Sequence, residues 1–314
     1  MQLREVERDI YAWIVPDRGW GWSNSGFVSR GGGLVVDTLF DVGHTRQMLE
    51  AYASVASQSP RRLVNTHDNG DHCWGNQLLR DAEIIGHRLC AEAMQKGLSP
   101  QAMSAMAGMA DASPGARWFA EDVAEFDFSE VEITPPTTLV DERLDLDLDG
   151  RPCAVVYMGP AHTAGDVVVH LPEDGVLFTG DLLFRLCTPI GWDGTFSGWM
   201  NAIDRMLALE PAVVVPGHGP VSDVDGLREF KAYLEYVLQE SKHGFERGLS
   251  EIECAERIDL GPYADWTQPE RVVFNVARAY RELGGGAWND PVNAIELMDR
   301  AVELRAHWKA AQSA

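Results

Sequence analysis

The sequence lacks the apolar segments that would direct a chain into or across a membrane. No apolar run reaches the length needed to span a bilayer, and the first nine residues contain no apolar core of a signal peptide. We therefore expect a cytoplasmic protein that does not insert into membranes. Its 314 residues are 45% hydrophobic, which is ordinary for a folded chain and excludes extensive disorder.

Basic residues are also scarce. The chain has 26 Lys and Arg against 48 Asp and Glu, which gives a formal net charge of -22. Nucleic-acid binding depends on neutralising phosphates with Lys and Arg, so this balance argues against a nucleic-acid partner. It argues equally against binding to an anionic membrane surface.

Cysteine is rare and scattered. An odd number of cysteines without C-x-x-C spacing argues against a disulfide framework and against a structural zinc knuckle. Cys73 and Cys187 lie near candidate site residues, but buried free cysteines usually behave as small hydrophobes, so we expect packing roles. The five cysteines are Cys73, Cys90, Cys153, Cys187 and Cys254.

The sequence does contain a long succession of short β-type runs bounded by turn residues. An amphipathic helix is expected among them at residues 44–58, where apolar side chains recur at helical spacing. The expected strands are 9–16, 26–29, 33–37, 62–64, 83–87, 153–158, 166–171, 176–181 and 212–216.

Two stretches depart from this pattern. Residues 91–130 are rich in Ala and Met and predict two helices, which we interpret as an insertion that could cover a site. After about residue 225 only helical patterns remain. We therefore expect a first domain over residues 1–225, with its insertion, and a C-terminal helical region over residues 226–314 packed on it.

The segment N-T-H-D-N-G-D-H-C-W-G-N, residues 65–76, carries the densest set of metal-binding groups. His67, Asn69, Asp71 and His72 fall within six residues after a strand, and Gly70 permits a sharp turn there. Imidazole with carboxylate suits a borderline cation such as zinc, with manganese or iron as alternatives. Taken alone, the segment also fits a polar turn with a chance histidine pair.

Three further candidate ligands, His162, Asp181 and His218, lie at the ends of other strands. Strand ends of one sheet meet at one edge, so all of these segments can build a single site. The ordered set H-x-N-x-D-H, G-P-A-H-T, T-G-D and P-G-H-G resembles the metallo-β-lactamase superfamily of metal-dependent hydrolases. The resemblance covers residues 9–221.

The resemblance implies an α+β fold, the αββα sandwich, whose first domain is catalytic and holds two metal positions at the edge between its sheets. Asp37 would orient a ligand histidine, although a turn cap is the alternative for this residue. The implied ligands of the first position are His67, Asn69 and His162. Those of the second position are Asp71, His72 and His218, and Asp181 bridges the two positions.

Asn69 departs from the family pattern, which has histidine at this position. A neutral carboxamide oxygen is a weaker zinc ligand than imidazole, so the chain is expected to hold one or two zinc ions. The alternatives are an enzyme that binds one metal ion, an enzyme that binds a different metal, and a protein that has lost its activity.

A bound cation would activate water for attack on a carbonyl carbon, with Asp71 and Asp181 orienting that water. Instead of binding the metal, Asn69 could donate its amide N–H to the substrate or to the reaction intermediate. Aromatic residues near the site indicate a sizeable apolar or planar substrate, and we expect an ester, thioester or lactone, either a small molecule or an acyl group on a carrier protein. The tryptophans expected to bind it are Trp20, Trp22, Trp74, Trp192 and Trp199.

A narrower resemblance is to cyclase and thioesterase members of the superfamily that act on aromatic polyketides, where the metal would also promote aldol ring closure. The shared features are chain size, the Trp-rich front loop and the altered ligand set. A non-catalytic metal-binding scaffold is the remaining alternative, with the C-terminal helices forming a homodimer interface.

Overall fold

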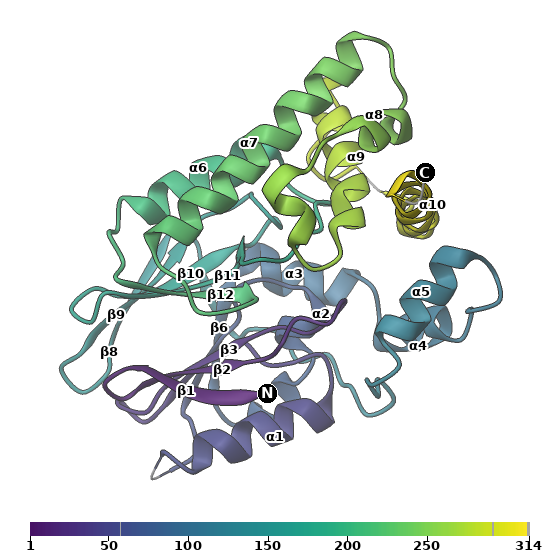
Figure 1. Cartoon of the computed structure of the whole chain (residues 1–314). Coiled ribbons are helices and arrows are strands. Elements are labelled where there is room, and N and C mark those ends of the chain that lie inside the picture. The colour runs from purple at the N-terminus through teal and green to yellow at the C-terminus, as the bar shows by residue number, and fades with distance from the viewer. Residues whose placement is uncertain (57, 291, 313–314) are drawn as a thin grey trace.

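Two β-sheets pack face to face, and helices cover both outer faces of the pair (Figure 1). The computed structural model describes residues 1–56, 58–290 and 292–312. The α+β sandwich predicted from the sequence is confirmed. Within the described residues, no helix combines the length and the apolar character that crossing a membrane would require.

The first sheet has seven strands in sequence order, antiparallel from β1 to β4 and parallel from β4 to β7. The sequence did not predict β1, because this edge strand alternates charged and half-buried residues and offers no apolar run. The strands are β1 (Gln2–Glu7), β2 (Ile10–Ile14), β3 (Ser25–Val28), β4 (Leu34–Val36), β5 (Arg62–Val64), β6 (Glu83–His87) and β7 (Thr138–Val140).

The second sheet has five strands in the order β12-β11-β10-β9-β8. β10 and β11 form the predicted antiparallel hairpin, while β12 joins β11 in parallel. A parallel pair requires a crossover, which α6 supplies between these two strands. The strands are β8 (Arg143–Asp147), β9 (Pro152–Tyr157), β10 (Val167–Leu171), β11 (Val176–Phe184) and β12 (Val213–His218).

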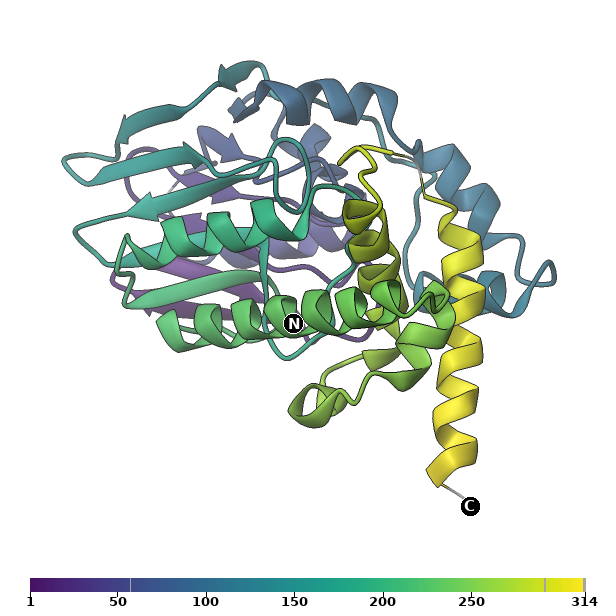
Figure 2. The ribbon, with the colours of Figure 1, turned by 90° about the horizontal axis from the view of Figure 1, so that it is seen from above.

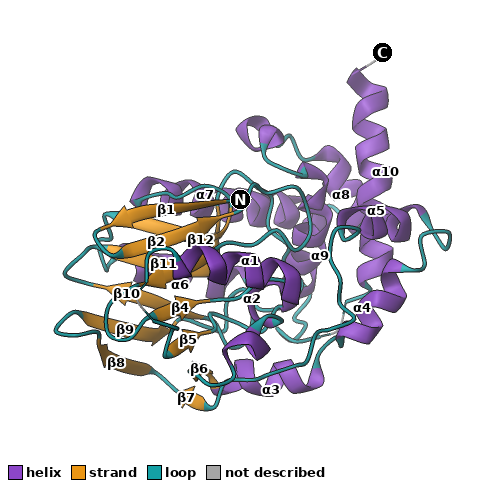
Figure 3. Ribbon diagram, turned by 90° about the horizontal axis from the view of Figure 1, so that it is seen from below, coloured by secondary structure: helices purple, strands orange, loops and turns teal. Residues whose placement is uncertain are grey.

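The helices form the outer layers. α1 covers the first sheet (Figure 3), and α6 and α7 lie side by side over the second (Figure 2). The α-helices are α1 (Val42–Ala53), α2 (Gly70–Cys73), α3 (Arg88–Lys96), α4 (Pro100–Ala107), α5 (Pro114–Asp122), α6 (Phe196–Leu207), α7 (Val224–Glu246), α8 (Glu251–Arg257), α9 (Val272–Leu283) and α10 (Ala294–Gln312). Three short 3-10 turns are η1 (Asn76–Leu79), η2 (Gly261–Asp265) and η3 (Pro269–Arg271).

The region predicted as a two-helix insertion contains parts of three helices, α3, α4 and α5. Ser99 and Ser113 each cap a new helix, with the side chain accepting a hydrogen bond from the N–H three residues later and proline at the first helical position. The two caps start α4 and α5 as separate helices after α3, so the Ala- and Met-rich stretch has one more helix than its apolar spacing predicted.

Apolar side chains fill the space between every pair of layers. Val36, Val169 and Phe178 are buried between the two sheets, and Met48 and Tyr52 of α1 are buried against the first sheet. Burial of each such side chain stabilises the fold by about 1.5–3 kcal/mol. A third cluster continues from the second sheet through α6 and α7 to α9 and α10. The division of the chain at about residue 225 stays a prediction.

α10 packs across α5, so the insertion and the C-terminal helices contact each other. The backbone N–H of Gly115 donates to Asp299 Oδ1 at 2.7 Å. Arg305 pairs with Glu270 at 3.2 Å and places its guanidinium carbon 5.5 Å from the centroid of the Trp118 ring. These contacts join the two parts of the chain that lie outside the sandwich.

Replacing Gly115 with alanine should loosen this contact. The new Cβ would clash with the Asp299 amide and lie 2.6 Å from the Met298 carbonyl carbon, both backbone atoms. We expect the free energy of unfolding to fall by about 1–3 kcal/mol in denaturant titrations, with faster amide exchange in α10. Gly108→Ala is the control, because its Cβ would meet no atom closer than 3.4 Å. Equal stability of both variants would contradict the packing of α10 on α5.

Candidate metal centre

The seven predicted ligands meet at one edge of the sandwich, where strand ends of both sheets converge. Side-chain atoms of His67, His72 and Asp181 lie within 4.8 Å of one another, and so do those of Asp71, His72 and His218. Asp181 lies inside β11, rather than in a loop after a strand as the sequence suggested, and His218 is the last residue of β12.

Two glycines leave the room that this convergence needs. Gly180 has a φ of +51°, and a Cβ there would lie 2.6 Å from the Cβ of Thr66. A Cβ at Gly217 would clash with the carboxylate of Asp181. The glycine of the T-G-D segment therefore allows β11 to approach the loop after β5, and the glycine of the P-G-H segment leaves room for Asp181 between β11 and β12.

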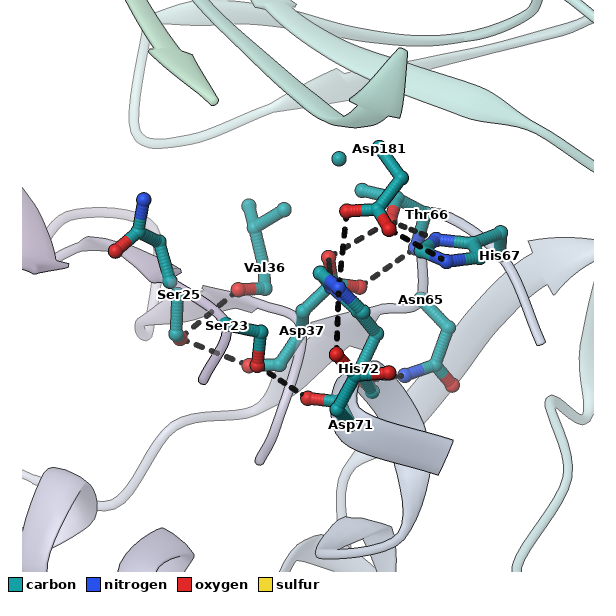
Figure 4. Close-up of polar contacts among 12 residues, drawn as sticks. Ser23, Ser25, Val36, Asp37, Asn65, Thr66, His67, Asp71, His72 and Asp181 are labelled. Carbon is teal, nitrogen blue, oxygen red and sulfur yellow. Dashed lines mark hydrogen bonds and ion pairs between the residues drawn. The ribbon is translucent and has the colours of Figure 1, made fainter. Parts of the chain in front are cut away.

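Asp37 holds the ring of His72 in place (Figure 4). Its Oδ1 accepts a hydrogen bond from the Thr66 N–H at 2.7 Å, and its Oδ2 accepts from Thr66 Oγ1 at 2.7 Å and from His72 Nδ1 at 3.0 Å. Because Nδ1 carries the hydrogen, His72 Nε2 is left with its lone pair directed toward Asp181 Oδ1, 3.1 Å away. This geometry favours the orienting role of Asp37 over a turn cap.

His218 and His67 are held in the same tautomer. His218 Nδ1 donates to the carbonyl oxygen of Trp22 at 3.1 Å, so its Nε2 faces Asp71 Oδ2 at 3.3 Å. The Thr66 hydroxyl gives its hydrogen to Asp37, so the 3.0 Å contact between Thr66 Oγ1 and His67 Nδ1 requires an Nδ1–H on His67. Three imidazole lone pairs therefore point toward two carboxylates.

Lone pairs facing carboxylate oxygens need a positive charge between them. His72 Nε2 and Asp181 Oδ1 are both buried and have no hydrogen-bond partner in the described part of the chain. Unpartnered buried polar atoms are costly. A divalent cation would satisfy both atoms, so the residues present fit a metal.

Without a metal, the carboxylates would have to draw protons onto the imidazoles. Burial disfavours the charged form of His218, but Asp181 and Asp71 outweigh this effect and raise its pKa to about 10. Burial likewise opposes ionisation of Asp181, yet His218 and His72 hold its pKa well below the usual range. The site therefore has a built-in demand for positive charge, which a bound cation meets more fully than protons.

Asn69 occupies the position between two imidazoles of the first metal position. Its Oδ1 lies 3.1 Å from His67 Nε2 and 2.9 Å from His162 Nε2. Burial lowers the pKa of His162 to about 3 and also lowers the pKa of His67, so both rings are neutral. The first position thus gathers three neutral groups and only the shared Asp181, whereas the second position also has the charge of Asp71. We infer that the first position binds a cation more weakly.

A cavity of about 340 Å³ opens directly beside these ligands. Asn69, Asp71, His162, Asp181 and His218 form one wall. The other walls are mostly apolar and come from the front loop, the insertion and the C-terminal helices: Trp20, Phe40, Trp74, Met94, Leu98, Met103, Met106, Phe119, Ile190, Trp192, Val292 and Met298.

The predicted substrate-binding tryptophans divide into two groups. Trp20, Trp74 and Trp192 line the cavity. Trp22 and Trp199 do not, so the structure gives no support to the prediction that they contact substrate. Trp22 packs against Phe126, and Trp199 packs against the ring of His162 at 5.2 Å while its indole N–H donates to Leu182. Both are buried where they hold site residues in place.

The sequence did not single out three charged residues of the cavity wall, Asp68, Asp193 and Arg271. Asp68 stands inside the histidine motif, where burial and the charge of Asp193 raise its pKa to about 7. Arg271 belongs to the C-terminal helical region and carries no motif that could have marked it. Cys73 and Cys187 are buried, and burial raises the pKa of both thiols well above the usual value, as suits packing roles.

The fold is the αββα sandwich, and its site brings together His and Asp groups that could hold a metal ion. A family profile of the metallo-beta-lactamase superfamily matches residues 18–218, and the chain belongs to this superfamily. The chain is similar to the 2,4-dinitroanisole O-demethylase subunit alpha of Nocardioides sp. (strain JS1661), with 27% identity over 191 residues that cover 60% of this chain and 49% of that one.

It is also similar to hydroxyacylglutathione hydrolase of Maricaulis maris (strain MCS10), with 39% identity over 157 residues, 50% of this chain and 47% of that one. Among solved structures, the sec-alkylsulfatase Pisa1 from Pseudomonas sp. has a TM-score of 0.69 at 17% identity, covering 93% of this chain and 51% of that one, which shows a shared fold. The chain spans about half the length of these relatives.

Asn69→His should strengthen the first metal position. We expect the native chain, purified without chelators or added metal, to hold one ion tightly and a second weakly, because Asn69 supplies only a neutral carboxamide. In the variant, affinity at the weaker position should rise by about tenfold or more. Elemental mass spectrometry measures the metal content, and chelator competition measures the affinity. Asn69→Ala is the control, and it should weaken binding at the first position further. Two tightly held ions in the native chain would contradict this.

Asp37→Asn should weaken metal binding through His72. Asparagine tolerates the φ of +62° at this position, but it has only one side-chain oxygen, so its NH2 group must face either the Thr66 N–H or the donors Thr66 Oγ1 and His72 Nδ1. We expect a loss of about 10–100-fold in metal affinity, measured by competition with a chelating dye. The matched control is Asp41→Asn, a buried carboxylate that caps α1 and touches no predicted ligand. If both variants lose affinity equally, the orienting role of Asp37 is wrong.

Proposed function

We propose that the protein is a metal-dependent hydrolase in which water attacks the carbonyl carbon of an ester, thioester or lactone and the acyl–oxygen or acyl–sulfur bond breaks, in a sizeable apolar or planar substrate. The observation that carries this proposal is the cavity in which the metal-ligand residues form one wall and aromatic and methionine side chains form the others. Pockets that bind organic ligands combine this apolar lining with a few precisely placed polar groups.

The cavity walls suit a flat or flexible acyl group. Trp20 and Trp192 lie with ring centroids 5.4 Å apart, and Phe40 stacks on Trp74 at 5.1 Å. Such aromatic surfaces bind planar groups well. The methionines of α3, α4 and α10 add adaptable apolar surface, which accommodates substrates of more than one shape.

A bound divalent cation would act as a Lewis acid and would lower the pKa of a water bound to it, so that hydroxide is available at neutral pH. The chain's own residues would do the rest. Burial opposes ionisation of Asp71, but His72 and His218 hold its pKa below the usual value, so it stays an ionised carboxylate that can orient water by accepting a hydrogen bond from it. Asn69 presents Oδ1 to His67 and His162, which leaves its Nδ2 amide to donate to the substrate.

The relatives support an acyl substrate. One of them is named for hydrolysis of hydroxyacylglutathione, an acyl conjugate of a small thiol. We propose either a small-molecule conjugate or an acyl group carried on a protein. The formal charge of -22 weighs against nucleic-acid substrates.

Ring closure of a polyketide is a second candidate, favoured by the enclosure of the cavity between aromatic walls and by the single strong metal position inferred from Asn69. Lewis acid activation of a ketone would use the same ligands. A non-catalytic metal-binding scaffold would account for the unpartnered ligand atoms but gives no reason for the apolar cavity beside them. Analysis of products by mass separates hydrolysis from ring closure, because hydrolysis adds one water and ring closure with dehydration removes one.

Asp71→Asn should abolish most turnover. The zinc-loaded chain is expected to hydrolyse aromatic thioesters and esters such as S-phenyl thiobenzoate and 2-naphthyl acetate, and the variant should lose about 10²–10⁴-fold in kcat. Asp141→Asn, an exposed residue paired with Arg88, is the control and should keep full activity. Unchanged turnover and metal content in Asp71→Asn would refute the assignment. A zinc-loaded native chain inert toward the whole panel would refute hydrolysis.

A further inference from the structure

A buried arginine lies in the wall of the cavity that contains the metal ligands. Arg271 ends η3 at the start of α9, and only 2% of its surface is exposed. The guanidinium hydrogen-bonds to the Thr188 carbonyl through Nη1 at 3.3 Å. Its Nε and Nη2 atoms are buried without any hydrogen-bond partner in the described part of the chain.

The carboxylates around Arg271 are engaged elsewhere. Glu270 pairs with Arg305 at 3.2 Å. Asp122 Oδ2 accepts hydrogen bonds from Gln268 Nε2 at 2.7 Å and from the Trp20 N–H at 3.4 Å. Among the described residues, no carboxylate forms an ion pair with Arg271, so its charge is buried and only partly compensated.

Trp20 adds a third unpartnered donor to the same wall. The guanidinium carbon of Arg271 lies 5.6 Å from the centroid of the Trp20 ring. The indole Nε1–H of Trp20 is buried and has no partner among the described residues, and both residues line the cavity. Guanidinium and indole groups only donate hydrogen bonds, so this cluster can bind an acceptor and cannot bind a cation.

The charge pattern of the cavity fixes which acceptor fits. Of the lining residues that the structure describes, Arg271 is the one lysine or arginine, and the other charged side chains are Asp68, Asp71, Asp181 and Asp193. An anion would be repelled by the aspartates except beside Arg271. Nε and Nη2 form one edge of the planar guanidinium, which matches two oxygens of an oxyanion.

We propose that Arg271 and Trp20 form a binding subsite for an oxyanion carried by the substrate, such as a carboxylate or a sulfonate on an aromatic ring system. The two oxygens would accept from Arg271 Nε and Nη2, and a third contact would come from Trp20 Nε1. Bound this way, an aromatic acyl substrate is oriented with its charged end at α9 and its reacting group toward Asp71. The binding of an oxyanion is inferred from the donor cluster alone. The orientation of an acyl substrate toward Asp71 rests on the proposed function as well.

Arg278 provides an internal control for this assignment. It lies two turns further along α9, is equally buried, and also has unpartnered Nε and Nη1 atoms. Its Nη2 donates to the Ala287 carbonyl at 3.2 Å, but it does not line the cavity. Unpartnered nitrogens alone therefore do not make a subsite, and the position of Arg271 in the cavity wall distinguishes it.

The test compares binding of naphthalene-2-sulfonate with that of its neutral analogue, methyl 2-naphthyl sulfone. Titration calorimetry and quenching of tryptophan fluorescence report binding without any turnover. We expect the native chain, with and without zinc, to prefer the sulfonate by about tenfold or more, and Arg271→Met to lose this preference. Arg278→Met should keep it. Arg271→Lys, which retains the charge and the fold, should keep only part, because lysine lacks the paired N–H groups.

Two outcomes would overturn the inference. A preference that persists in Arg271→Met and Arg271→Lys would place the anion elsewhere. A preference that the native chain shows only with zinc would place the anion on the metal. Failure of the proposed function can be told apart from failure of the subsite. A chain that is inert toward the ester and thioester panel but prefers the sulfonate would refute only the proposed function. An active hydrolase without this preference would refute only the subsite.

Discussion

The structure depends on one electrostatic constraint, the need to place a cation where buried imidazole lone pairs face the carboxylates of Asp71 and Asp181. Asp37, Thr66 and the Trp22 carbonyl fix the hydrogen on Nδ1 of three histidines, so every Nε2 is committed to the centre. The rings and Asp181 are buried, and Asp71 is mostly buried beside the cavity, so little water reaches these groups. The properties of the site therefore depend on which positive charge, a metal ion or protons, lies between the imidazoles and the carboxylates.

The sandwich supplies the geometry for that constraint. Parallel pairing of β4 with β5 and of β11 with β12 brings the carboxyl ends of four strands to one edge. Gly180 then removes the side-chain bulk that would push β11 away from Thr66 in the loop after β5 of the first sheet, and Gly217 leaves room beside β12 for the carboxylate of Asp181. The ligands come from segments more than 150 residues apart in the chain, yet each is positioned by ordinary strand register.

The sequence predicted the sandwich and the ligand set because both are written locally. His67, Asp71 and His72 share one short motif, and His162 and His218 follow recognisable strands. The walls of the cavity could not be predicted this way, because they depend on tertiary packing. Nothing local distinguishes Trp199, which supports a ligand histidine, from Trp192, which faces the cavity. Arg271 was missed for the same reason, since a basic residue on an amphipathic helix normally faces solvent.

The contact between α5 and α10 has a further consequence for how this chain can change. Both helices lie outside the two sheets, and both α10 and the adjoining insertion contribute walls of the cavity, while every predicted metal ligand lies within the sandwich. Substitutions in the covering helices can therefore reshape the cavity without moving a ligand. Under the proposed function, the ligand edge can be inherited unchanged while changes in the covering helices alter the range of accepted molecules.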